Sequence, residues 1–203
     1  MVDKRTETAQ CFWTADAERN RVVHADNGKE PVVLCMQGRM VVMQVQVDRA
    51  AGLSYKVRFF HVDPDFTKEG RVIAEVGADS HPALQVNGRP LRCAVPSSVA
   101  FDGMLTVVYP ESAGIEPSRT LYPSPRNPVI VDEWHLRNVS TTPLTVDVSM
   151  PGSVTPATKN TLLVWTGQDP ASTVVEPGGT VSVARCLRAR LKDGPDMTPV
   201  VDM

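Results

Sequence analysis

Residues 114–150 read GIEPSRTLYPSPRNPVIVDEWHLRNVSTTPLTVDVSM, and this stretch decides the fold class of the chain. It contains three runs of strand length, 115–122, 129–137 and 144–149, and the short segments that connect them are rich in proline and asparagine. Because side chains alternate along a strand, the second run puts Ile130, Trp134 and Leu136 on one face. The stretch therefore predicts an antiparallel sheet with one buried face and one face that is more exposed to solvent.

The rest of the chain repeats this pattern of short alternating segments. Residues 39–48 and 53–62 predict a long hairpin, and Asn87-Gly88 predicts a tight turn between strands 83–86 and 89–94. The 17 prolines are spread through the chain, and no helical period of twelve or more residues occurs. We expect an all-β fold, a large antiparallel two-sheet β-sandwich over residues 11–191, with a loose tail at 1–10 and a linker-like ending at 192–203.

Composition excludes several classes of function. The chain has 203 residues, 42% of them apolar, and a formal net charge of −2. This balance gives no electrostatic reason to expect a nucleic acid or an anionic membrane as partner. The first ten residues are polar and lack the apolar core of a secretory signal, which favours a cytoplasmic location.

The four cysteines, Cys11, Cys35, Cys93 and Cys186, lie far apart and in apolar runs. We expect all four to be buried free thiols, because reducing compartments disfavour disulfides. Their spacing and the scattered histidines do not match a zinc site, so we predict no metal and no cofactor.

The central stretch also resembles a known family. The segments GIEPSRTLYPS, PVIVDEWHLRN and PLTVDV, with VNGRPL at 86–91 and FDGMLT at 101–106 upstream, look like the N-terminal β-sandwich ("supersandwich") domain of bacterial glycoside hydrolases with an (α/α)6 barrel. These enzymes are relatives of amylo-α-1,6-glucosidases and α-L-rhamnosidases. The resemblance covers roughly residues 84–150 and consists of strand and turn patterns, so it concerns the fold more than the chemistry.

The resemblance implies a non-catalytic accessory domain or subunit, because the catalytic carboxylates of that family lie on the helical barrel. The expected partners are a helical-barrel catalytic domain or subunit and an oligosaccharide. Residues expected to face a shared sugar groove are Arg119, Tyr122, Glu133 and His135. Two other functions stay open, a free-standing carbohydrate-binding module and a structural β-sandwich that mediates oligomerisation.

Each candidate residue also has a structural interpretation. Asp132 and Glu133 are neighbours on a strand and point to opposite faces, so they cannot converge on one glycosidic bond. One of the two could line a sugar groove. We favour the structural alternative, in which they form a solvated strand face or a salt bridge to Arg137 or Arg119. Trp134 shares a face with apolar neighbours, which predicts a core position rather than a sugar-stacking platform.

Two further motifs are weak. His135 shares a face with Glu133, so a Glu–His hydrogen bond is an option, but it is weak evidence for acid–base chemistry. Asn138-Val-Ser140 matches a glycosylation acceptor, and without a secretory signal we interpret this match as chance.

Overall fold

The computed structural model describes residues 22–23, 32–48, 52–60, 72–77, 82–93, 95–101, 104–167 and 170–193. The described residues form strands and turns and no helix, so the predicted all-β class is confirmed. All the paired strands run antiparallel. The expected tail 1–10, Cys11 and most of the expected linker 192–203 lie outside the described residues.

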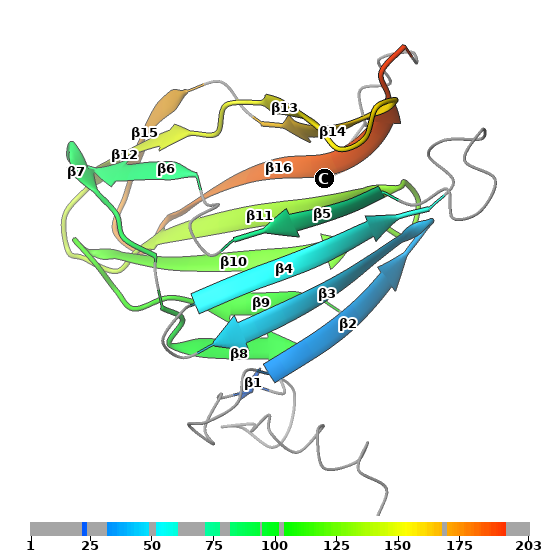
Figure 1. Ribbon diagram of the computed structural model, residues 1–203. Helices are drawn as coiled ribbons and strands as arrows, with labels where there is room; N and C mark the ends of the chain where they lie inside the picture. Colours follow the sequence, from blue (N-terminus) through cyan, green and yellow to red (C-terminus); the bar gives the residue numbers. More distant parts are fainter. Residues whose placement is uncertain are drawn as a thin grey trace, which may run out of the picture.

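One large sheet forms the first layer of a sandwich (Figure 1). Its eight strands are, in spatial order, β1 (Val22–Val23), β8 (Ser98–Phe101), β9 (Leu105–Val108), β10 (Ile115–Pro123), β11 (Val129–Asn138), β16 (Thr180–Leu191), β14 (Thr161–Thr166) and β13 (Ser153–Pro156). We call it the large sheet. Its longest strands, β10, β11 and β16, lie side by side at the centre and pair over nine residues at each junction.

Two separate four-stranded sheets form the second layer. The first, sheet C, has the order β2 (Val32–Gly38), β3 (Val41–Asp48), β4 (Gly52–Phe59) and β5 (Val72–Val76). The second, sheet D, has the order β15 (Ala171–Val175), β12 (Leu144–Ser149), β6 (Ala83–Val86) and β7 (Arg89–Pro90). The two-layer sandwich is as expected, whereas the division of one layer into two sheets was not predicted.

The strand assignments from sequence agree with the structure in most places. The predicted hairpin over 39–48 and 53–62 is present as β3 and β4, and the alternation of β3 puts Val41, Met43, Val45 and Val47 in the core. Asn87 and Gly88 adopt positive φ values of 48° and 74°, which a tight two-residue hairpin turn requires. Pro90, which cannot donate a ladder hydrogen bond, lies on β7 at the edge of sheet D.

The path of the central stretch differs from the simplest interpretation of its sequence. β10 and β11 form the expected hairpin, but β12 leaves the large sheet and pairs with β6 and β15 in sheet D. The segment between β11 and β12 is therefore an arch that crosses from one layer to the other. The two short strands β8 and β13 were not predicted, because neither has a clear alternating pattern.

One hydrophobic core joins the three sheets. Fully buried residues from the large sheet, such as Ile130, Trp134 and Leu136, belong to the same cluster as Phe59 of sheet C and Val146 of sheet D. Trp134 has no exposed surface and its ring stacks on Tyr109 with centroids 5.5 Å apart. The prediction that Trp134 is a core residue is confirmed. Trp165 of β14 is only partly buried and packs against the cluster.

Candidate functional site

The structure separates the four predicted site residues onto two faces of the large sheet. Arg119 lies on the inner face, where only 2% of its surface is exposed. Tyr122, Glu133 and His135 lie on the outer face, away from sheets C and D. This follows from alternation, since Arg119 is an odd number of residues from Tyr122 on β10. The sheet therefore brings three of the four together and puts Arg119 in the core.

The inner face holds a charged cluster, which we define as Arg119, Asp132 and Arg185. These residues come from the adjacent strands β10, β11 and β16. Arg119 donates from Nε to Asp132 Oδ1 at 2.6 Å and from Nη2 to Oδ2 at 2.8 Å. Arg185 donates from Nε to Asp132 Oδ2 at 2.7 Å. Both carboxylate oxygens are thus bound by guanidinium groups, an arrangement that gives strong, directional hydrogen bonds.

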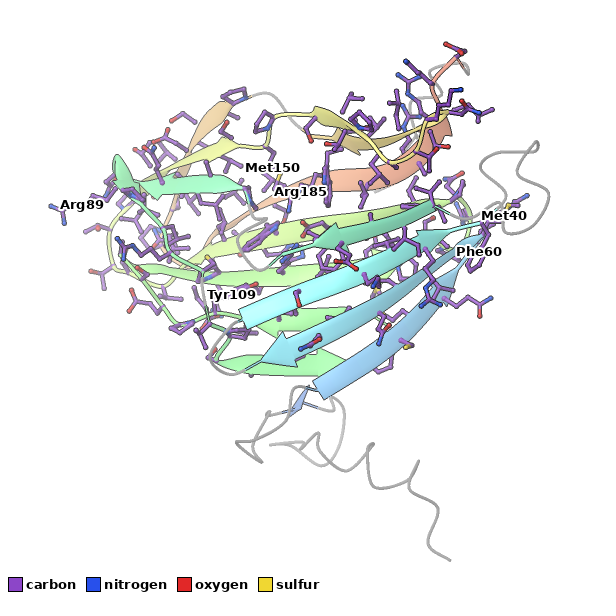
Figure 2. The ribbon with its side chains drawn as sticks, in the orientation of Figure 1. Met40, Phe60, Arg89, Tyr109, Met150 and Arg185 are labelled. Atoms are coloured by element: carbon purple, nitrogen blue, oxygen red, sulfur yellow. The ribbon has the colours of Figure 1, made fainter. Side chains whose placement is uncertain are left out.

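Aromatic rings surround this cluster. The Arg119 guanidinium lies 5.1 Å from the ring centre of Trp134 and 5.7 Å from that of Tyr55, which comes from sheet C. Arg185 lies 4.2 Å from the ring centre of Trp165. Figure 2 shows Arg185 between β16 of the large sheet and sheet D. The ion pairs join neighbouring strands of the large sheet, and the cation–π contact of Arg119 with Tyr55 links the cluster to sheet C in the other layer.

Burial and the neighbouring positive charges shift the pKa of Asp132 in opposite directions. Burial alone would raise the pKa of this carboxyl group, but the charges and hydrogen bonds of Arg119 and Arg185 outweigh it. The pKa of Asp132 is therefore held below its ordinary value. Nearby, burial and the charge of Asp132 raise the pKa of the Tyr55 hydroxyl, although Arg119 acts in the other direction.

The chemistry of Asp132 follows from this environment. The carboxylate has no exposed surface, stays ionised, and uses both oxygens to hold arginines. A general acid needs a proton to give and access to the substrate, and Asp132 has neither. The salt bridge to Arg119 was one of the predicted alternatives, whereas a solvated strand face is wrong for Asp132. The partner Arg185 was not predicted.

The outer face presents its side chains in rows across β10, β11 and β16. The strand register places Ser118, His135 and Ser182 in one row and Thr120, Glu133 and Ala184 in the next. The third row is Tyr122, Val131 and Cys186. We call these three rows the outer-face site. It is polar at one end and apolar at the other, where Val129, Val131, Cys186 and the half-buried Tyr122 form a small hydrophobic cluster separate from the core.

The polar end contains a Ser–His–Glu set. The His135 Nδ1 and Ser182 Oγ atoms are 2.8 Å apart, and Glu133 Oε1 lies 3.8 Å from His135 Nε2. The Glu133–His135 contact is thus an ion-pair distance rather than the hydrogen bond considered from the sequence. Acyl transfer by such a set also requires free N–H donors for an oxyanion, but here the two strands use their backbone groups in the ladder. The set suits hydrogen bonding to hydroxyl groups instead.

The negative charge of Glu133 also affects the pKa of Tyr122, at the apolar end of the outer-face site. Burial is the main cause that raises the pKa of Tyr122, and the charge of Glu133 adds to it. The phenol thus stays protonated and can donate a hydrogen bond while its ring presents an apolar face. Burial likewise raises the pKa of the Cys186 thiol to about 11, which makes it an unreactive neighbour in this row.

A shallow depression of about 260 Å³ lies on the exposed face of sheet D. The register places Gln85, Asp147 and Ser172 side by side across its floor, with Ala83 and Ser149 in the next row. No sequence argument pointed to it, because its residues come from three strands far apart in the chain. Its polar floor suits hydrogen bonding, but its lining residues include no aromatic ring on which a sugar could stack.

The free thiols agree only in part with expectation. Cys35, Cys93 and Cys186 are unpaired. Cys93 and Cys186 are buried as predicted, but Cys35 is exposed because it points outward from β2 at the edge of sheet C. Among the described residues, no group of three or more His, Cys, Asp and Glu side chains is placed to hold a metal ion. The described part of the chain also includes no helix that could cross a membrane.

The arch between the layers explains the Asn138-Val-Ser140 motif. Asn138 is completely buried, and its Nδ2 donates to the carbonyl oxygens of Thr142 and Val175, each at 2.8 Å. Its Oδ1 accepts from Ser140 N and Ser140 Oγ. An amide that already uses both its hydrogens in the interior is inaccessible to glycosylation in the folded protein. The hydrogen bonds of Asn138 and Ser140 therefore stabilise the arch between β11 and β12.

The sequence matches no protein-family model, and no curated protein matches it either. The likeness to the supersandwich domain of glycoside hydrolases therefore remains a resemblance of strand and turn patterns.

Proposed function

We propose that this chain is a non-catalytic accessory β-sandwich domain or subunit of a glycoside hydrolase. In this proposal it packs against a helical-barrel catalytic partner and contributes a contact to the oligosaccharide through the outer-face site. The observation that carries the proposal is the row arrangement on the outer face, where the row of Tyr122 lies next to the row of Glu133, and the row of His135 and Ser182 follows. Saccharides bind to such mixed surfaces because each sugar has apolar C–H faces and polar hydroxyl edges.

The charged cluster supports the non-catalytic part of the proposal. Hydrolysis of a glycoside requires two carboxyl groups roughly 5–10 Å apart on the same side of a pocket. Asp132 and Glu133 lie on opposite faces of the sheet, and Asp132 is held by two arginines. In this proposal Arg119, which the resemblance placed in the groove, stabilises the fold and does not contact the sugar.

Saccharide binding is tested by titrating the purified chain with gluco- and rhamno-oligosaccharides and following backbone amide shifts by NMR. Tryptophan fluorescence is a poor probe, because Trp134 is buried and the outer-face site has no tryptophan. We expect shifts in β10, β11 and β16, and their loss in Tyr122→Ala. Gln85→Ala, in the depression on sheet D, serves as the matched control. Shifts confined to sheet D and abolished by Gln85→Ala would contradict the outer-face site.

The catalytic partner is tested separately. The reading frame next to the gene is expected to encode a helical-barrel protein, or the barrel to follow in the same frame. Co-expression should yield a complex that Tyr122→Asp weakens, because a charge would enter the apolar end of the outer-face site. Failure of any encoded barrel protein to bind the chain would argue against the accessory role.

A further inference from the structure

Strand β15 is an edge strand without the usual protection. It pairs with β12 on one side, and no other described strand pairs with it. Its sequence, Ala171-Ser-Thr-Val-Val175, has no charge and no proline, and its first four residues are exposed. Val174 is 61% exposed, the largest fraction among the large hydrophobic residues found exposed. Natural edge strands usually carry a lysine, a proline or a bulge, because bare edges pair with other chains.

The other edge of sheet D is protected in the ordinary way. β7 has only two residues, an arginine and a proline. Figure 2 shows Arg89 projecting outward beyond this edge. Proline cannot donate a ladder hydrogen bond, and the charged side chain disfavours the addition of another strand. Within the part of the chain that the structure describes, sheet D therefore has one protected edge, β7, and one unpaired edge, β15.

We propose that β15 is a dimerisation edge, at which two copies of this chain pair their β15 strands antiparallel about a two-fold axis. An axis at Thr173 places Thr173 opposite its copy, Ser172 opposite the partner's Val174 and Ala171 opposite the partner's Val175. Each of these pairs is uncharged, and β-branched residues favour cross-strand contact. Glu176 falls opposite the partner's Pro170, so no like charges meet. The strand is thus complementary to itself, as a two-fold interface requires.

The pairing ends with two copies. It joins two four-stranded sheets into one eight-stranded sheet, whose outer edges are both the protected β7. A closed dimer, rather than a growing fibre, is the expected product. The contact is mainly a five-residue ladder, which is smaller than a typical stable interface, so we expect reversible association that depends on concentration.

The first test measures mass by sedimentation equilibrium over a hundredfold range of concentration. The wild-type chain should move from one to two chains per particle. Thr173→Lys should remain monomeric, because two ammonium groups would face each other on the axis. Val154→Lys is the matched control, since Val154 is 57% exposed on β13, an edge of the large sheet. It should dimerise like wild type. A wild-type chain that stays monomeric, or Thr173→Lys that still dimerises, would overturn the proposal.

The second test fixes the register by disulfide cross-linking. Opposite residues in an antiparallel pair have Cα atoms about 4.5–5.5 Å apart, within the range of a disulfide. Thr173→Cys should therefore cross-link to its copy under mild oxidation. Val174→Cys should not, because two such residues lie diagonally, about 7–8 Å apart. The wild-type chain, which keeps its exposed Cys35, sets the background. Equal cross-linking of both variants would contradict this register.

Discussion

At the scale of single residues, Asp132 and Glu133 show how much one step along a strand changes. Asp132 points inward, has no exposed surface and binds two arginines, whereas Glu133 points outward and is partly exposed. Removing one partner of a buried ion pair leaves the other charge uncompensated, which costs about 3–5 kcal/mol. A charge on a sheet surface contributes much less.

We therefore expect Asp132→Asn to lower the free energy of unfolding by about 3–5 kcal/mol. The neighbouring Glu133→Gln should change it by less than about 0.5 kcal/mol, because it removes no buried charge. Urea unfolding followed by circular dichroism measures both. Equal losses in the two variants would show that the charged cluster does not stabilise the fold.

The stabilisation that Asp132 provides should depend on pH. The pKa of Asp132 is lower in the folded protein than its ordinary value, so its stabilisation is fully present above the unfolded pKa of about 3.9. That stabilisation is lost as the pH falls through the lower, folded pKa. The difference in unfolding free energy between wild type and Asp132→Asn should thus be constant near neutral pH and shrink below about pH 4. A difference that grows in acid would contradict the assignment.

The thiols provide another test at this scale. In denaturant without reductant we expect four reactive groups, because the described cysteines are unpaired and Cys11 is predicted to be free. In the native protein Cys35 should react with a thiol reagent well before Cys93, whose pKa burial raises to about 12. A count of two or fewer in denaturant would show that disulfides exist. Loss of the fast native phase in Cys35→Ser is the control.

At the scale of elements, close backbone contacts decide how the layers meet. Gly38 ends β2 where the chain lies against the segment after β10, and the Arg39 N–H donates to the Ser124 carbonyl at 2.9 Å. A Cβ added to Gly38 would lie 2.4 Å from that carbonyl oxygen, so one of the two backbones would have to move. This glycine is therefore required by the contact between sheet C and the large sheet.

We expect Gly38→Ala to destabilise the protein by about 1–3 kcal/mol, as overpacking usually does. Gly77→Ala is the matched control, because a Cβ at that position meets nothing within 4 Å. Gly77→Ala should leave the melting temperature unchanged or raise it slightly, since alanine reduces the entropy of the unfolded chain. Thermal unfolding compares the two variants. A smaller loss for Gly38→Ala than for Gly77→Ala would contradict the close contact.

At the scale of the whole molecule, the expected activity follows from where the carboxyl groups lie. We expect the isolated chain not to hydrolyse aryl α-glucosides or aryl α-rhamnosides, because Asp132 is inaccessible and Glu133 faces the other side of the sheet. A chromogenic assay of the purified chain measures this, with and without any barrel protein encoded nearby. Turnover by the isolated chain that Glu133→Gln abolishes would make the outer-face site an active site.

Much of this fold was readable from the sequence, because alternation is a local property of a strand. The pattern at 129–137 predicted that Trp134 is buried, that Asp132 and Glu133 point to opposite faces, and that His135 shares a face with Glu133. The Asn87-Gly88 turn was predicted from two residues, because few others adopt positive φ easily. The sequence also contained a signal for the charged cluster, because Arg119, Asp132 and Arg185 each occupy an inward position between apolar residues.

Other features depended on which strands pair, and pairing is set by contacts between residues far apart in the chain. Asn138 is followed by a polar segment that suits a hairpin turn, yet its amide binds Val175 and directs the chain into the other layer. The separation of Arg119 from Tyr122 followed from alternation, but the choice of the face that the core covers required the sheet, because a single strand does not decide it. Local alternation thus determined the strands and which side chains share a face, while the packing of the three sheets decided which face of the large sheet is buried with the charged cluster, and which described strands, such as β15, lie at an edge.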